Sequence, residues 1–210
     1  MIDIIDVGCG NIQSLTNILT LLQVPSRAVN SPNQVKSNTI ILPGVGSAGP
    51  YMDKLKESSL DQAIKKHHSE GKRIIGICLG FQLLTISSEE DGGTECLGLV
   101  DAQTEKIGSN QLRNCSHTGW EHFQIDTEYF NAAECQAQLG LTRKRKLKGR
   151  VFYNHEYGVC STSEDAAHLE IPNKMYAGYS SMVVQKNLIG IQFHPEKSQV
   201  TGLNLFEMML

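Results

Sequence analysis

Hydrophobic positions in the first half of the chain form short runs, and each run is followed by a turn and then by a segment whose apolar residues recur at helical spacing. The apolar runs cover residues 2–7, 39–42 and 72–77, and the segments with helical spacing cover residues 12–22, 52–68 and 79 to about 87. Short apolar strands that alternate with helices are typical of a parallel sheet covered on both faces. The pattern therefore predicts an α/β fold.

From about Leu97 onward the apolar runs become shorter and are separated by turns. They cover residues 98–100, 121–125, 150–153, 181–184 and 188–193. Such pieces favour antiparallel or mixed strands, and no repeat, low-complexity tract or linker divides the chain. We expect one domain over residues 1–210: an open, mostly parallel twisted sheet with helices on both faces, plus additional antiparallel strands in the second half.

Composition and charge exclude several classes of protein. A chain of 210 residues that is 40% hydrophobic can bury a full core, and a formal net charge of −3 is not the basic footprint of a nucleic-acid-binding protein. No apolar run approaches the roughly 18 residues of a membrane span, and the start has no basic region or cleavage site of a secretory signal. We therefore expect a cytoplasmic protein that binds neither membrane nor nucleic acid.

The strongest charge run is RKRKLKGR at residues 143–150. It is interpreted either as a solvated loop or as a docking patch for an acidic partner or an anionic ligand.

The six cysteines lie far apart and include no Cys-x-x-Cys pair. They are at positions 9, 78, 96, 115, 135 and 160. This spacing suggests neither a zinc site nor a compact disulfide framework, so the ordinary role of each is a small buried side chain.

Cys78 differs from the other cysteines because of its neighbours. The stretch GICLG at residues 76–80 follows the apolar run and has the form Gly-x-nucleophile-x-Gly, in which a strand meets a helix through a tight, strained turn. Such a turn projects the thiol out of the sheet at a helix N-terminus, where free amides and the helix dipole favour the thiolate. Cys78 is therefore a candidate nucleophile.

A nucleophilic thiolate also needs a base and oxyanion donors. His67 and His68 lie on a polar helix, where we expect them to be solvated, and four other histidines, at positions 117, 122, 155 and 168, lie in or near loops and short strands. His194 instead ends an apolar run in the stretch IQFHPE, and Glu196 follows two residues later. Glu196 could hold the tautomer of His194, which would complete a group of nucleophile, base and orienting acid.

Several motifs in order then resemble one family. The stretches GICLGFQLL, GIQFHPEKS and PGVGS (residues 43–47) are similar to those of the class I, or triad, glutamine amidotransferases. Residues 88–90, HTGW at 117–120 and FYNHEY at 152–157 most resemble the glutaminase subunit (HisH type) of imidazole glycerol phosphate synthase. The resemblance runs from residue 6 nearly to residue 210.

The resemblance implies roles for individual residues. Cys78 would attack the side-chain amide of L-glutamine and release ammonia, with His194 as the proton shuttle and Glu196 as its orienting group. The oxyanion hole would be formed by the backbone N–H of Leu79 and one from the loop 44–46. The implied residues of that loop are Val45 and Gly46, and the implied substrate-binding residues are Gln82, Glu90, His155 and Tyr157. No metal or organic cofactor is implied.

The resemblance also implies a partner. Ammonia would pass to a cyclase subunit with a (β/α)₈ barrel, in a heterodimer, for the synthesis of imidazole glycerol phosphate and aminoimidazole carboxamide ribotide in histidine biosynthesis. The chain departs from the usual family pattern at Val7, Glu121 and Glu156.

Three alternatives stay open at this point. One is a glutaminase subunit that supplies a sugar amidotransferase acting on surface polysaccharides. The second is a non-catalytic binding subunit of the same fold, and the third is a cysteine hydrolase of the related peptidase group.

Overall fold

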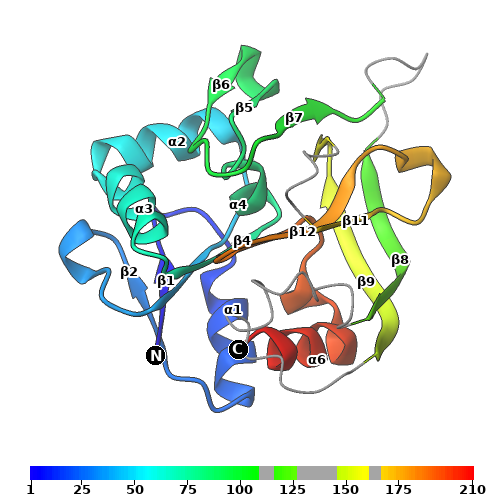
Figure 1. The fold of residues 1–210 in the computed structure, drawn as a ribbon, viewed down its shortest axis with the longest axis horizontal. Helices are drawn as coiled ribbons and strands as arrows, with labels where there is room; N and C mark the ends of the chain where they lie inside the picture. Colours follow the sequence, from blue (N-terminus) through cyan, green and yellow to red (C-terminus); the bar gives the residue numbers. More distant parts are fainter. Residues whose placement is uncertain (109–115, 127–145, 161–166) are drawn as a thin grey trace.

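A computed structural model describes residues 1–108, 116–126, 146–160 and 167–210. Its largest sheet has seven strands in the order β11-β12-β13-β4-β3-β1-β2 (Figure 1). The strands are β1 (Ile2–Ile5), β2 (Ser26–Val29), β3 (Thr39–Leu42), β4 (Arg73–Ile77), β11 (Ala167–Glu170), β12 (Ser180–Gln185) and β13 (Leu188–Ile191). The strands from β13 through β4, β3 and β1 to β2 pair parallel with one another, whereas β12 pairs antiparallel with both β11 and β13. The predicted sheet class is confirmed.

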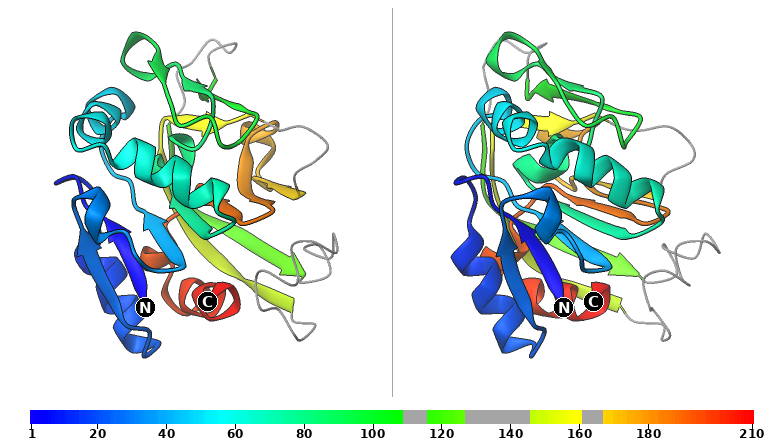
Figure 2. Two further views of the ribbon diagram at one scale, coloured as in Figure 1. Left: turned by 60° about the vertical axis from the view of Figure 1, so that its left-hand side comes forward. Right: turned by 90° about the vertical axis from the view of Figure 1, so that its left-hand side faces the viewer.

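Helices cover both faces of this sheet (Figures 1 and 2). One face carries α1 (Ile12–Leu21) and α6 (Gln199–Met209), and the other carries α2 (Ala48–Glu57), α3 (Leu60–Ser69) and the short α4 (Leu79–Gln82). The 3₁₀ turns among the described residues are η1 (Pro32–Gln34), η2 (Glu90–Gly92), η4 (Lys174–Tyr176) and η5 (Pro195–Lys197).

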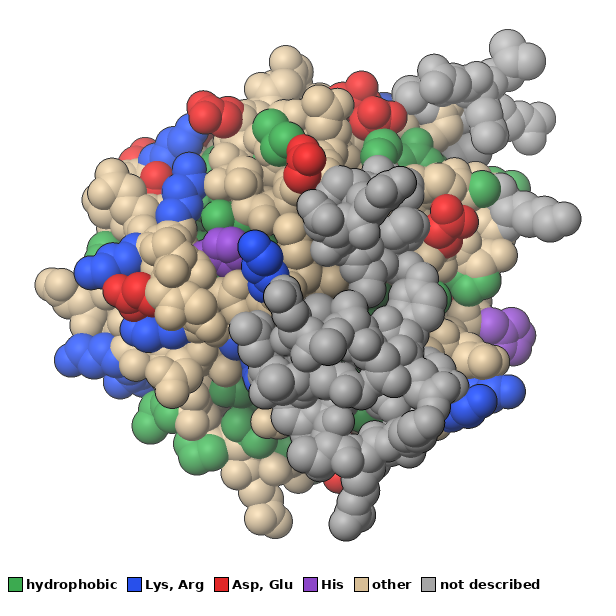
Figure 3. Space-filling model, viewed as in Figure 1, with side chains coloured by type: hydrophobic (Ala, Val, Ile, Leu, Met, Phe, Trp, Pro, Cys, Tyr) green, Lys and Arg blue, Asp and Glu red, His purple; other side chains and the backbone are tan. Residues whose placement is uncertain are grey.

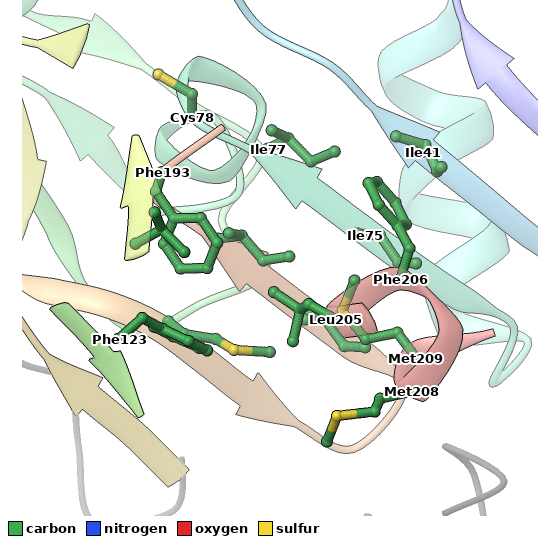
Figure 4. Close-up of a cluster of buried hydrophobic side chains, with 14 of the residues drawn as sticks. Ile41, Ile75, Ile77, Cys78, Phe123, Phe193, Leu205, Phe206, Met208 and Met209 are labelled. Atoms are coloured by element: carbon green, nitrogen blue, oxygen red, sulfur yellow. The ribbon is translucent and has the colours of Figure 1, made fainter. Parts of the chain in front are cut away.

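The core follows from the alternation of side chains along the strands. On β4, Ile75 and Ile77 pack into the cluster beneath α1 and α6, whereas Ile74 packs with α2 and α3. Figure 4 shows the first cluster, in which Phe206 of α6 lies against the strands. Because the central strands are buried on both faces, their sequences are continuous runs of apolar residues.

Two smaller sheets flank the carboxyl end of β4. One has the order β10-β7-β5-β6 and is made of β5 (Ser87–Ser88), β6 (Thr94–Glu95), β7 (Gln103–Lys106) and β10 (Tyr157–Val159). The other is the antiparallel pair of β8 (His117–Asp126) and β9 (Lys146–His155). These strands bring residues 116–118 and 154–157 to the same end of the main sheet as Cys78.

Some sequence expectations about elements were wrong. The single helix expected over residues 52–68 is two helices, because Ser59 adopts a left-handed conformation (φ 57°) that ends α2 and starts α3 in a new direction. The helix expected to about residue 87 stops at Gln82, and residues 98–100 form no strand. Helix α6 and strand β2 were not anticipated.

Two surface expectations also change. His67 is buried, and its Nε2 atom lies 3.1 Å from the carbonyl oxygen of Arg73. Residues 146–150 of the basic run are part of β9 and not of a loop, and residues 143–145 lie outside the described residues. On the face shown in Figure 3, basic and acidic side chains are interspersed. Within the described ranges, no helix has the length and apolarity that a membrane crossing requires.

Candidate active site

The chain turns sharply between β4 and α4, and Cys78 occupies that turn. Its backbone (φ 53°, ψ −111°) lies outside the regions that L-residues ordinarily adopt. The turn is possible because residues 76 and 80 are glycines and have no Cβ atom. A Cβ atom at Gly80 would overlap the carbonyl oxygen of Leu42, and one at Gly76 would lie 2.8 Å from the carbonyl oxygen of Gly80. The two glycines therefore let three backbone segments meet, as the motif predicts.

The Cys78 side chain is 5% exposed, and its sulfur points away from the apolar cluster (Figure 4). Its backbone N–H donates to the carbonyl oxygen of Ile191, at 2.7 Å, which ties the turn to the end of β13. The Gln192 side-chain amide lies 3.8 Å from Sγ and the Asn154 carbonyl oxygen lies 4.0 Å from it. Sγ thus faces polar groups.

His194 reaches the same place from the adjacent strand β13. Its backbone N–H donates to Phe152 of β9 at 2.8 Å, and its Nδ1 atom lies 2.8 Å from Oε1 of Glu196. The side chain of Asn11, before α1, donates to the same carboxylate oxygen at 3.4 Å. The imidazole and the carboxylate are both nearly inaccessible to solvent, so their pairing is not screened by water.

The electrostatics of this pair favour a charged imidazole. Burial acts to lower the pKa of His194, but its hydrogen bonds to Cys78 and Glu196, and the charges of those groups, outweigh burial and raise this pKa to about 10. His194 therefore holds a proton beside Sγ at neutral pH. An imidazolium next to a sulfur nucleophile is the arrangement that stabilises a thiolate.

These groups open into a cavity of about 420 Å³. Nine residues singled out in the sequence line it: Val45, Gly46, Cys78, Leu79, Gln82, Glu90, His155, Tyr157 and His194. Glu196 lies behind His194 and does not line the cavity. Lining residues that received no role from the sequence are Gly44, Ser116, Thr118, Asn154 and Glu156. Of these, Thr118, Asn154 and Glu156 belong to stretches that carried the family resemblance.

The polar wall of the cavity converges on the carbonyl oxygen of Tyr157. This oxygen accepts hydrogen bonds from Gln82 Nε2 at 2.6 Å and from His155 Nδ1 at 2.7 Å. Gln82 Nε2 also lies 3.3 Å from Oε1 of Gln192, the residue whose amide faces Cys78. Gln192, which is fully buried, was missed because an amide inside an apolar strand run has no distinctive signal.

Glu90 and Asp91 connect the cavity to the amino end of α2. Glu90 accepts a hydrogen bond from the backbone N–H of Ala48 at 2.9 Å, and Asp91 accepts from Gly49 N–H at 2.8 Å and from the Ser47 hydroxyl. Both carboxylates therefore cap a helix that has no cap of its own. Burial raises the pKa of Glu90, and the bond from Ala48 opposes this change.

The loop before α2 packs directly on the elbow. A Cβ atom at Gly44 would overlap the backbone of Gly80 and the side chain of Leu79, whereas Gly46 has φ +118° and open space around it. The backbone N–H of Leu79 is at the first position of α4 and so has no partner within the helix. Among the described residues, no group of three or more His, Cys, Asp or Glu side chains could hold a metal ion.

The family model for glutamine amidotransferase class-I matches residues 3–207. The chain belongs to this family. It is similar to subunit HisH of imidazole glycerol phosphate synthase from Bacillus subtilis, with 34% identity over 98% of this chain and 93% of that protein. It is 28% identical to imidazole glycerol phosphate synthase hisHF, chloroplastic, of Arabidopsis thaliana, over 100% of this chain and 34% of that protein. Among solved structures, a chain of PurLQS from Thermotoga maritima shares the fold, with a TM-score of 0.74 at 18% identity over 99% of this chain and 96% of that one.

Proposed function

We propose that this chain is the glutaminase subunit of an imidazole glycerol phosphate synthase, which hydrolyses L-glutamine to glutamate and ammonia for histidine biosynthesis. Support comes from the matched relatives, whose names specify that synthase, and from the site. The single observation that carries the proposal is the strained Cys78 in the lining of a cavity, together with the buried His194–Glu196 pair.

The first half of the reaction uses the sulfur and the imidazolium. The Cys78 thiolate attacks the Cδ atom of the glutamine side chain, and the carbonyl oxygen becomes an oxyanion. The Leu79 N–H and an N–H of the loop that contains Val45 and Gly46 are suited to donate to it. His194 gives its proton to the departing nitrogen, so that ammonia leaves and a γ-glutamyl thioester remains.

The second half reverses these roles. Water attacks the thioester carbonyl, His194 takes a proton from that water, and the thiolate leaves as glutamate forms. Glu196 keeps Nδ1 of His194 protonated throughout, so that Nε2 is the nitrogen that exchanges protons. Glu196 is therefore a positioning group and not a proton donor.

The part of the cavity near Glu90 is suited to bind the α-amino and α-carboxylate groups of glutamine. Glu90 offers a carboxylate for the α-ammonium group, and Gln82, Tyr157 and His155 also line the cavity. Both ring nitrogens of His155 are engaged within the protein, so its contribution to binding is shape.

The ammonia acceptor is a separate cyclase subunit with a (β/α)₈ barrel, in a cytoplasmic heterodimer, which forms imidazole glycerol phosphate and aminoimidazole carboxamide ribotide. The Arabidopsis relative supports a partner, because this chain corresponds to only 34% of that protein, which is named hisHF. Free ammonia would be protonated in water, which favours direct transfer to the acceptor.

The test is ammonia and glutamate release from L-glutamine, with and without the cyclase and its nucleotide substrate. Cys78→Ala is expected to lose at least about 10³-fold in kcat, because the covalent step is removed. The matched control is Cys96→Ala, since Cys96 is also buried but does not line the cavity. Absence of Cys78-dependent ammonia release with cyclase and acceptor bound would overturn the proposal.

A further inference from the structure

The segment that follows β13 brings two polar side chains to the nucleophile, and the proposed reaction uses only one of them. Gln192 and His194 are two positions apart, so in an extended segment their side chains lie on the same side. Their backbone N–H groups donate to the carbonyl oxygens of Ser181, at 2.9 Å, and Phe152, at 2.8 Å, which fixes both residues. Phe193, between them, packs on the other side into the apolar cluster (Figure 4).

The side-chain amide of Gln192 contacts the sulfur of Cys78. Its Nε2 atom lies 3.8 Å from Sγ, and Gln192 is fully buried, so water does not compete for this contact. The Asn154 carbonyl oxygen, 4.0 Å from Sγ, can accept from a thiol but has no proton to offer a thiolate. An N–H group that faces a sulfur anion favours the charged form of that sulfur.

A backbone carbonyl determines which end of the Gln192 amide faces the sulfur. The Tyr157 carbonyl oxygen can only accept, so the Gln82 atom 2.6 Å from it is the amide nitrogen, Nε2. The same Nε2 atom lies 3.3 Å from Gln192, and a donating nitrogen requires an oxygen there, which is Oε1. Gln192 therefore turns its own nitrogen toward Sγ. The reversed amide would place two NH₂ groups against each other and an oxygen against the thiolate.

Resting on the proposed glutaminase function, we propose that Gln192 is a further catalytic residue, which donates a hydrogen bond to Sγ of Cys78 and stabilises the thiolate before attack and again when it leaves the thioester. Gln82 is then also a positioning residue, because its Nε2 atom holds the Gln192 amide in the required orientation. Since Gln82 lines the cavity, one side chain connects the substrate wall to the nucleophile.

Gln192 differs from His194 because its amide does not titrate. His194 gives up a proton when ammonia leaves and takes one from water afterwards, so its charge changes within each turnover. The amide of Gln192 offers the same donor at every step. The other described titratable groups around Sγ are Glu196, which is paired with His194, and those that line the cavity: Glu90, His155, Glu156 and Tyr157.

The test follows alkylation of Cys78 by iodoacetamide as a function of pH, read by mass spectrometry of the peptide that contains residue 78. In Gln192→Met the length of the side chain is kept and the donor is lost, so the pH of half-maximal rate is expected to rise by about one. The matched control is Asn187→Leu, which removes another buried amide, at the opposite end of β13, that donates to the carbonyl oxygens of His68 and Lys72. It is expected to keep the wild-type profile.

Kinetics and a second variant supply further readouts. Because Gln192 does not line the cavity, kcat for glutamine is expected to fall about tenfold in Gln192→Met, with KM within about threefold of wild type. Gln82→Met leaves Gln192 in place but removes the donor to its Oε1 atom, so the pH of half-maximal alkylation is expected to rise by about 0.5. Alkylation requires no bound glutamine, so the role of Gln82 in substrate binding does not affect this readout.

The outcomes separate this inference from the proposed function. A folded Gln192→Met protein with the wild-type alkylation profile would overturn the inference even if glutaminase activity is present, and where only Gln82→Met folds, its profile decides in the same way. An equal shift in Asn187→Leu would also overturn it, because a loosened sheet would then explain the effect. A shift confined to the two glutamine variants supports the inference even where no glutamine is hydrolysed, and that lack of activity would count against the proposed function alone.

Discussion

The cavity has two walls that are built in different ways. The elbow wall, with Cys78 between Gly76 and Gly80, is held by backbone segments packed so closely that a single added carbon does not fit. The hairpin wall, formed by the ends of β8 and β9 around His155 and Tyr157, is held by hydrogen bonds between polar groups. The conformation of the elbow wall is therefore determined by excluded volume. That of the hairpin wall depends on individual hydrogen bonds, and so on which ring nitrogens carry protons.

The largest effect is expected where the elbow wall is filled. In Gly80→Ala the new Cβ overlaps the Leu42 carbonyl, so β3 and α4 must separate, at a cost of about 3 kcal/mol or more in the free energy of unfolding. Urea unfolding measures this cost. Gly71→Ala is the matched control, because Gly71 has φ +73° and open space around it, so only backbone strain of about 1 kcal/mol is expected. Equal costs for the two variants would mean that close packing does not determine the elbow.

The next largest effect is expected at the His194–Glu196 pair, in Glu196→Gln. The amide cannot stabilise the imidazolium and favours the wrong tautomer, so kcat for glutamine hydrolysis should fall by about 10²- to 10⁴-fold. Steady-state assays at saturating glutamine give this value. A loss below about tenfold would contradict the orienting role.

The His194–Glu196 pair should also make the stability of the protein depend on pH. The pKa of His194 is raised to about 10 in the folded protein, above the ordinary value of 6.5, so its contribution to stability is complete below pH 6.5 and is lost as the pH rises through 10. Unfolding free energies at pH 6.5 and pH 10 should therefore differ more for the wild type than for Glu196→Gln. Identical pH dependence in both proteins would exclude the pair as the source.

A smaller effect is expected where Glu90 and Asp91 join the cavity to α2. Glu90→Gln should raise the KM for glutamine about tenfold or more, since a charge opposite the substrate ammonium is removed. Asp91→Asn is the matched control, because Asp91 caps the same helix but does not line the cavity. It should lower the unfolding free energy by about 1 kcal/mol and leave KM unchanged. If both variants alter KM equally, capping and not charge explains the Glu90 effect.

The two walls also differ in how well the sequence predicts them. The elbow could be predicted because glycines on either side of Cys78, after an apolar run, admit few other conformations. The alternation of short apolar strands with helices likewise predicted the parallel sheet. The hairpin wall could not be predicted in detail, since the contact of His117 with His155 joins residues 38 positions apart through the pairing of β8 with β9. The break at Ser59 was missed because serine carries no strong signal for a left-handed conformation.

The smallest effect is expected at the exposed end of the hairpin wall. The Thr118 hydroxyl donates to Asn154 Oδ1 at 3.1 Å across the β8–β9 pair, next to the buried contact between His117 and His155. Water can replace this exposed bond, so Thr118→Val should change the unfolding free energy by about 0.5 kcal/mol or less and KM by less than about twofold. Paired urea titrations and glutamine saturation curves measure both quantities. A change in KM of more than about twofold would locate the stiffness of the wall at its surface; a smaller change leaves it with the buried contact between His117 and His155.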